Sequence, residues 1–215
     1  MKTFFLTIPF LILFSLQSKA QVDFQPRSSF KIEIGLPNNV TNSAFRELMQ
    51  GLAVVTTSYQ FTFENSISIG AGLRYNYFNV NEFKNTVDLT GGLHSTGVFG
   101  KVGQEKFYGN FGVDYGLRAG YTFNFFDTNK NEEFNGGPYQ EGALFFEPHL
   151  GLALMASENS SFRLALGYAF NSFEFRPNQV GLDNFSGFSD EDLTPISTFF
   201  TIGFGYSYYF KRTYS

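Results

Sequence analysis

The sequence predicts an all-β chain, a closed antiparallel up-and-down β-barrel of eight strands that crosses a membrane. Apolar and polar residues alternate through seven long segments, which is the period of a strand whose two faces meet different surroundings. Aromatic residues make up 20% of the chain and charged residues only 16%, below the roughly 25% that is usual in soluble domains. No segment after residue 20 is apolar for long enough to form a membrane-spanning helix.

The first twenty residues differ from the rest of the chain. They contain a basic Lys2, an apolar run over 4–16 and the small residues Ser18 and Ala20. This pattern predicts a secretory signal peptide that is cleaved after residue 20, and the apolar run is shorter than a spanning helix requires. We therefore expect residues 21–215 to form a single exported domain. Because the chain has no cysteine, a lipid-anchored cysteine and disulfides are excluded.

Alternation places the expected strands along the chain. The seven clear segments are 29–36, 52–63, 66–78, 107–126, 143–156, 161–171 and 196–210. Short Glu-Asn-Ser turns follow two of them, at 64–66 and 158–160, whereas the connections at 37–51, 127–141 and 176–195 are longer and polar. Barrels of bacterial outer membranes have short periplasmic turns and longer external loops. The same asymmetry is expected here.

The two short turns require one further strand. They lie at the same end of a barrel only if one more descending strand lies between residues 80 and 105. The candidate is 85–100, where Leu89 and Leu93 alternate with Thr90 and His94. We expect the eighth strand there, with both chain ends in the periplasm.

The volume of the interior decides which face of the strands points outward. An eight-stranded barrel has an interior that side chains fill, or that holds one small ligand. The apolar faces carry more than a dozen Phe and Tyr, which would overfill it, whereas the opposite faces are rich in Gly, Ser, Ala, Thr and Asn. We therefore expect the apolar faces to meet lipid. The alternative is a secreted soluble ligand-binding barrel, in which the faces would be reversed.

The last strand carries aromatic residues at alternate positions and finishes with Tyr206, Tyr208 and Phe210. This resembles the C-terminal signal by which outer-membrane barrels are recognised for insertion, although 211–215 extends beyond the usual terminal aromatic. With the signal peptide and the paired hairpins, the chain resembles the small outer-membrane β-barrel family of the OmpX/OmpA type over roughly 28–210. The resemblance implies an outer-membrane location in a diderm bacterium. It also implies contact with membrane lipid and lipopolysaccharide, and handling by the barrel-assembly machinery.

The inward faces would carry a balanced set of ionisable side chains. These are Lys31, Glu33, Arg74, Asp114, Arg118, Glu147, His149 and Arg163. An isolated buried charge is very costly, so we expect them to form ion pairs that close the lumen. The alternative is a narrow pore for ions or small solutes, lined by the same groups.

No pattern in the sequence indicates catalysis, a cofactor or a metal site. His149 and Glu147 share the expected lumen face, but no serine has support as their nucleophile. Residues 127–133 begin like a calcium loop but lack glycine at the sixth position and an acid at the twelfth, which is Pro138. We expect no enzyme, although an outer-membrane enzyme is a distant alternative.

Charge and the long loops bear on partners. The predicted cleavage removes 2 of the 15 basic residues and none of the 19 acidic residues, so the mature chain has net charge −6, which disfavours nucleic acid. The loop 176–195 is acidic, and we expect a solvated surface loop, the alternative being a cation-mediated contact with lipopolysaccharide or a partner. Residues 42–50 are expected to form one or two helical turns. Their apolar residues Phe45, Leu48 and Met49 should rest on the rim, or else lid the lumen. The external ligand stays unidentified.

Overall fold

The computed structural model describes residues 27–81, 88–182 and 195–210. The predicted signal peptide, the acidic residues 183–192 of the last long loop and the tail 211–215 lie outside these residues. The strands of the described chain are β1 (Arg27–Asn39), β2 (Met49–Thr62), β3 (Ile67–Val80), β4 (Gly91–Tyr108), β5 (Phe111–Thr128), β6 (Tyr139–Ser157), β7 (Ser160–Asn171) and β8 (Ser197–Phe210).

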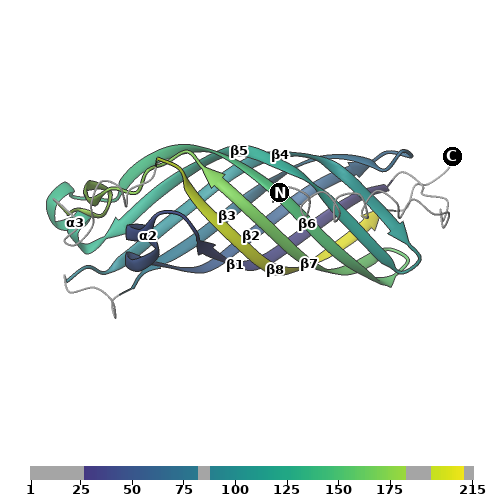
Figure 1. Ribbon diagram of the computed structural model, residues 1–215, viewed down its shortest axis with the longest axis horizontal. Helices are drawn as coiled ribbons and strands as arrows, with labels where there is room; N and C mark the ends of the chain where they lie inside the picture. The colour runs from purple at the N-terminus through teal and green to yellow at the C-terminus, as the bar shows by residue number, and fades with distance from the viewer. Residues whose placement is uncertain (1–26, 82–87, 183–194, 211–215) are drawn as a thin grey trace, which may run out of the picture.

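The strands form a closed barrel in chain order (Figure 1). Each strand pairs antiparallel with the next, and β8 closes the barrel on β1 with Ser28 opposite Phe210. The predicted closed, eight-stranded, up-and-down barrel is confirmed. Across the described ranges, no helix is long and apolar enough to cross a membrane.

The two ends of the barrel differ in their connections. At one end, called the hairpin end, short turns at 63–66, 109–110 and 158–159 join successive strands. At the other, called the helical end, lie α2 (Ser43–Leu48), α3 (Asn129–Asn135) and the 3₁₀ turn η1 (Pro177–Val180). The expected asymmetry of short turns and long connections is present.

The prediction of one continuous strand over 107–126 is wrong, because a hairpin turn interrupts this segment. Tyr108 ends β4, Phe111 begins β5 and the two residues pair across the turn. Gly109 has a φ of 62°, which a residue with a side chain rarely adopts and which two-residue hairpin turns require. Phe107 does not share a face with Phe111 as expected: it packs on the buried Tyr209, whereas Tyr108 is 49% exposed.

The eighth strand inferred from parity exists, but not over 85–100. It is β4, which begins at Gly91 and continues to Tyr108. The glycines at which the alternation faded lie within this strand, since Gly92 pairs with Asp127 and Gly100 with Ala119. Residues 101–106, between the expected strands 85–100 and 107–126, therefore belong to β4 and contribute side chains to the interior.

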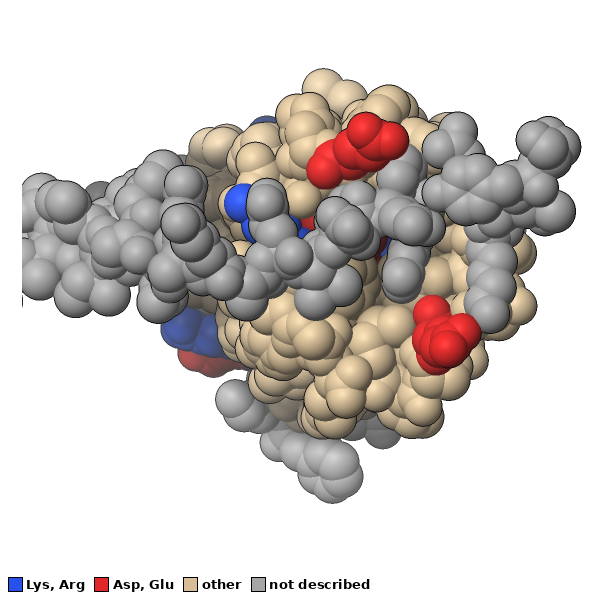
Figure 2. All heavy atoms as spheres, turned by 90° about the vertical axis from the view of Figure 1, so that its right-hand side faces the viewer, with Lys and Arg blue, Asp and Glu red and all other residues tan. Residues whose placement is uncertain are grey.

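The outer wall of the barrel is apolar. Large side chains point away from the interior on every strand, and Phe204, on β8, is 74% exposed. The view onto the hairpin end shows Lys, Arg, Asp and Glu side chains only as a few separate groups (Figure 2). With strands of 12 to 19 residues, the barrel is long enough to span the hydrocarbon layer, which takes about 9–11 tilted residues per strand. An apolar wall around a polar interior is the arrangement of a transmembrane barrel.

Candidate functional site: the filled interior

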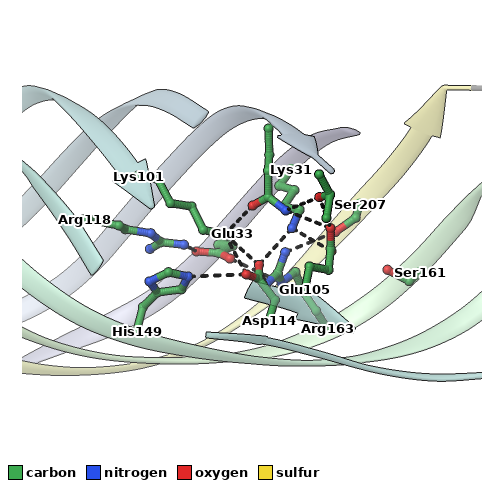
Figure 3. Close-up of polar contacts among 12 residues, drawn as sticks. Lys31, Glu33, Lys101, Glu105, Asp114, Arg118, His149, Ser161, Arg163 and Ser207 are labelled. Atoms are coloured by element: carbon green, nitrogen blue, oxygen red, sulfur yellow. Dashed lines mark hydrogen bonds and ion pairs between the residues drawn. The ribbon is translucent and has the colours of Figure 1, made fainter. Parts of the chain in front are cut away.

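The structure places all eight of the sequence-predicted lumen residues inside the barrel, and each is buried. Two further ionisable residues, Lys101 and Glu105 of β4, join them. We call these ten residues the charge network. Its ionisable side chains come from β1, β3, β4, β5, β6 and β7, and Figure 3 shows most of them converging from opposite walls.

Asp114 is the centre of the charge network. Its carboxylate accepts hydrogen bonds from Lys31 Nζ at 2.8 Å, Lys101 Nζ at 2.7 Å and Arg163 Nη2 at 2.6 Å. His149 Nε2 lies 3.7 Å from the same carboxylate. One acid of β5 thus meets cations of β1, β4 and β7, and it is only 1% exposed.

Glu105 lies nearer the hairpin end, and its carboxylate accepts hydrogen bonds from both charged and neutral side chains. It accepts from Lys31 Nζ at 2.8 Å, Gln60 Nε2 at 2.7 Å and Thr62 Oγ1 at 2.9 Å. The hydroxyl of Tyr209 on β8 donates to it at 3.1 Å. Through Gln60 and Tyr209, β2 and β8 also take part, so every strand of the barrel supplies a side chain to this region.

Three arginines pair with the two remaining acids, Glu33 and Glu147. Arg118 donates from Nη2 to Glu33 at 2.7 Å and from Nη1 to Glu147 at 3.1 Å. Arg74 donates to the other oxygen of Glu147, and Arg163 Nε lies 3.3 Å from Glu33. Such pairing offsets the desolvation cost of burying the charges, which would be several kcal/mol per unpaired ion.

Small residues make room for these long side chains. A Cβ built on Gly151 would collide with the guanidinium of Arg163, and one built on Gly205 would lie 2.9 Å from Cγ of Glu33. The glycine-rich inward faces are therefore the complement of the charge network. Between its members lies a cavity of about 20 Å³, lined by Glu33, Arg74 and His149 among others, which is the size of a single water molecule.

Toward the helical end the interior changes from charged to aromatic. Arg118 lies over the ring of Phe99 and Arg74 over the ring of Phe145, each 5.5 Å from the ring centroid, a distance at which cations and aromatic faces attract. These two rings lie 6.3 Å apart. They form the boundary of the charge network.

Beyond this boundary the lumen holds an apolar cluster, which we call the aromatic plug. Its members are Ala44, Phe45, Leu48, Met49, Phe78, Val80, Leu89, Leu93, Phe126, Ala143, Ala169, Phe173, Phe175, Val180 and Phe199. Phe45 is at its centre, 0% exposed, and meets the rings of Phe78, Phe175 and Phe199 at 5.1, 4.9 and 5.4 Å. Edge-on packing of this kind is favourable for aromatic rings.

The short helix α2 brings Phe45 into the barrel. The side chain of Asn42 caps the helix by accepting from the backbone N–H of Phe45 at 2.9 Å. The expectation that Phe45, Leu48 and Met49 rest on the rim is wrong: they are buried among the inward side chains of several strands, because these leave an apolar space that the rim could not offer.

Sequence reasoning missed Lys101, Glu105 and the aromatic plug. A usable signal for Lys101 and Glu105 was present in the sequence: with Phe99 and Gly103 they alternate with apolar or exposed neighbours. No periodicity marked the plug residues of 172–182. The three aromatics Tyr206, Tyr208 and Phe210 lie on the outer wall of β8, each about two fifths exposed.

The segment 127–133, which begins like a calcium-binding loop, does not form a loop. Most of it belongs to α3, which is capped by Thr128, and Asn131 is fully buried, donating to the backbone oxygens of Phe126 and Gln179 at 2.9 and 2.7 Å. Among the residues that the structure describes, no group of three or more His, Cys, Asp or Glu side chains is placed to hold a metal ion.

Comparison with known proteins identifies the fold. No family profile matches the chain, and no curated protein matches its sequence. Neisserial surface protein A superposes with a TM-score of 0.52 at 10% identity, over 85% of this chain and 97% of that one. Two further similar structures are Ail of Yersinia pestis, solved with the heparin analogue sucrose octasulfate, and the N-terminal β-barrel of Pseudomonas aeruginosa OprF. Their TM-scores are 0.47 and 0.40 at 14% and 13% identity, over 86% of this chain and 99% and 100% of theirs. At these identities the likeness concerns the fold.

Proposed function

We propose that this chain, which has the fold of the small eight-stranded outer-membrane barrels, is an integral outer-membrane protein of a diderm bacterium whose barrel is closed and whose helical end faces outward. Its role is structural or one of surface interaction. The observation that carries this proposal is the filled interior: a paired charge network and an aromatic plug follow one another along the lumen. A side-chain-filled eight-stranded barrel is a rigid support for external segments rather than a channel.

The route to the membrane follows from the two ends of the sequence. Residues 1–20 serve as a cleaved signal peptide, and 21–215 form the mature domain. Tyr206, Tyr208 and Phe210 serve as the signal read by the barrel-assembly machinery. Their rings project from the outer wall of β8, where a partner could reach them.

Contact with lipid headgroups is supported by a polar aromatic group on the outer wall. The hydroxyl of Tyr75 lies 2.8 Å from Nδ1 of His94, and the rings of His94 and Tyr77 are 4.8 Å apart. Tyr and other amphipathic rings favour the level where hydrocarbon meets headgroups. This group lies toward the helical end of β3 and β4, so it would meet the lipopolysaccharide leaflet.

The test is the conductance of refolded mature chain in a planar bilayer, with a general porin as the positive control. We expect no channels while folded protein is shown to be in the membrane, because a cavity of about 20 Å³ passes no hydrated ion. A double variant, Phe45→Ala with Phe175→Ala, should stay silent too, since the charge network remains. Discrete and reproducible channels from the unmodified chain would instead establish the narrow pore.

A further inference from the structure

The helical end carries a second cavity, which shares no lining residue with the small cavity of the charge network. It has a volume of about 290 Å³ and lies between the start of β6 and the segment after β7. Tyr139, Glu141, Glu174, Arg176, Asn178 and Gln179 line most of it. This volume is near the lower end for small-molecule sites, about 300 Å³, and corresponds to a small ligand.

The wall of this pocket is held in place by buried groups. Gln179, only 2% exposed, donates from Nε2 to Glu141 and to the backbone oxygen of Glu174, and its Oε1 accepts from the backbone N–H of Arg176 at 2.9 Å. On either side of Glu174, Phe173 and Phe175 are buried in the aromatic plug. The pocket is therefore anchored to the barrel, which lowers the ordering cost of binding.

The pocket presents donors and acceptors side by side. Arg176 Nη2 donates to one oxygen of Glu174 at 2.7 Å, which leaves the other oxygen as an acceptor. This contact raises the pKa of Arg176 further, so the guanidinium stays charged. Asn178 adds an amide, which both donates and accepts, and Tyr139 adds an aromatic ring. Mixed donors and acceptors beside a ring suit a ligand with several hydroxyl groups and an apolar face.

The charge of the lining selects among such ligands. Two carboxylates, of Glu141 and Glu174, face one guanidinium, so the lining has an excess of one negative charge. Exposed Asp127 and Glu132 lie at the same end of the barrel, and a third acid there, Glu133, is paired with Lys130 at 3.0 Å. An anionic ligand would be repelled, and an ammonium group would be attracted.

We propose that this pocket binds a saccharide of one or two rings at the cell surface, with a preference for a sugar that bears an ammonium group. The proposal deepens the surface-interaction role and rests on the outward orientation of the helical end. The hydroxyls pair with Glu174, Asn178 and Arg176, a ring face lies on Tyr139, and the ammonium group pairs with the acids.

The test is ligand-observed NMR on the mature chain in detergent micelles, with three probes. These are a disaccharide of two glucosamine units, its N-acetylated form and a sulfated disaccharide. We expect saturable binding of the first, several-fold weaker binding of the second and none of the third. No saturable binding of either unsulfated probe, or tightest binding of the sulfated one, would overturn the proposal.

Two variants and a matched control locate the binding. Glu174→Gln should weaken the glucosamine probe more than the acetylated probe, and Asn178→Trp should abolish both by filling the pocket. Asp88→Asn removes the same charge from an exposed position at the same end, outside the pocket, and should change neither. An equal loss in Asp88→Asn and Glu174→Gln would show attraction by the acidic end alone and reject the pocket. Silent conductance with no sugar binding would reject this inference and leave the closed barrel standing.

Discussion

The two halves of the interior are filled by opposite chemistries. The charge network is built from inward positions of the strands themselves and tied together by specific hydrogen bonds. The aromatic plug depends on segments outside the strands, α2 and 172–182, and on contacts between rings. A network of buried ions is sensitive to the loss of a member, because each partner left behind is a buried charge with one counter-charge fewer. A plug loses stability in proportion to the volume removed.

The largest effect should come from the centre of the charge network. Asp114→Asn keeps the shape of the side chain but leaves Lys31, Lys101 and Arg163 without their shared carboxylate. We expect a loss of about 4–5 kcal/mol in the free energy of unfolding, the upper part of the range for breaking a buried ion pair. Denaturant titration followed by far-UV circular dichroism would measure it. Asp127→Asn, on the exposed end of the same strand, is the control, and equal stabilities would contradict the central role of Asp114.

The plug should respond a little less. Phe45→Ala removes a ring that meets four other rings of the plug, and we expect a loss of about 3–4 kcal/mol from lost burial and the cavity left behind. Phe45→Leu fills most of the space and should recover a large part of the loss. The same titration decides the outcome, and a loss below about 1 kcal/mol would mean that Phe45 packs on the rim after all.

An added methyl group should destabilise the barrel where it points into the charge network and not where it points away from the barrel. Gly151→Ala puts a methyl group against Arg163, and we expect a loss of about 1–3 kcal/mol. Gly100→Ala is the matched control because a Cβ at Gly100 would meet no atom within 4 Å. Thermal unfolding of the two variants side by side gives the difference. If the two variants unfold at the same temperature, the interior has more room beside Gly151 than the contacts imply.

The smallest expected effect is the coupling free energy between the charge network and the aromatic plug. The ring partners of Phe45 and the charged partners of Asp114 have no residue in common. In a double variant that combines Asp114→Asn with Phe45→Ala, the two losses in the free energy of unfolding should therefore add to within about 0.5 kcal/mol. A larger coupling energy, obtained from the complete double-mutant cycle, would show that plug and network unfold as one unit.

The sequence alone was sufficient for the faces of the strands. Lys31 and Glu33 alternate with Phe30 and Ile34, and the volume of an eight-stranded interior excludes the bulky face from the lumen. Because the side-chain period of a strand is two, this one decision assigns the inward position of residues as distant as Arg74 and Arg163. The strand count followed from the parity of the turns.

The hairpin at Gly109 could not be located from the alternation. Across a two-residue turn the paired residues Tyr108 and Phe111 face the same side, so the outward face moves from even to odd numbers. Since both Phe107 and Tyr108 are aromatic, either assignment gives the same apolar pattern. The pairing of β4 with β5 decided it, and with it the inward direction of Lys101 and Glu105.

The sequence by itself determined a closed barrel with an apolar wall and a charged lumen, because local alternation and total side-chain volume admit few other solutions. Only the tertiary structure decided what fills the other half of the lumen. Phe45, Phe173 and Phe175 lie in connections without periodicity, and an apolar side chain there can rest on a rim or enter a lumen. The inward faces of strands distant in sequence leave an apolar space of the right size, and that space exists only once the barrel has closed.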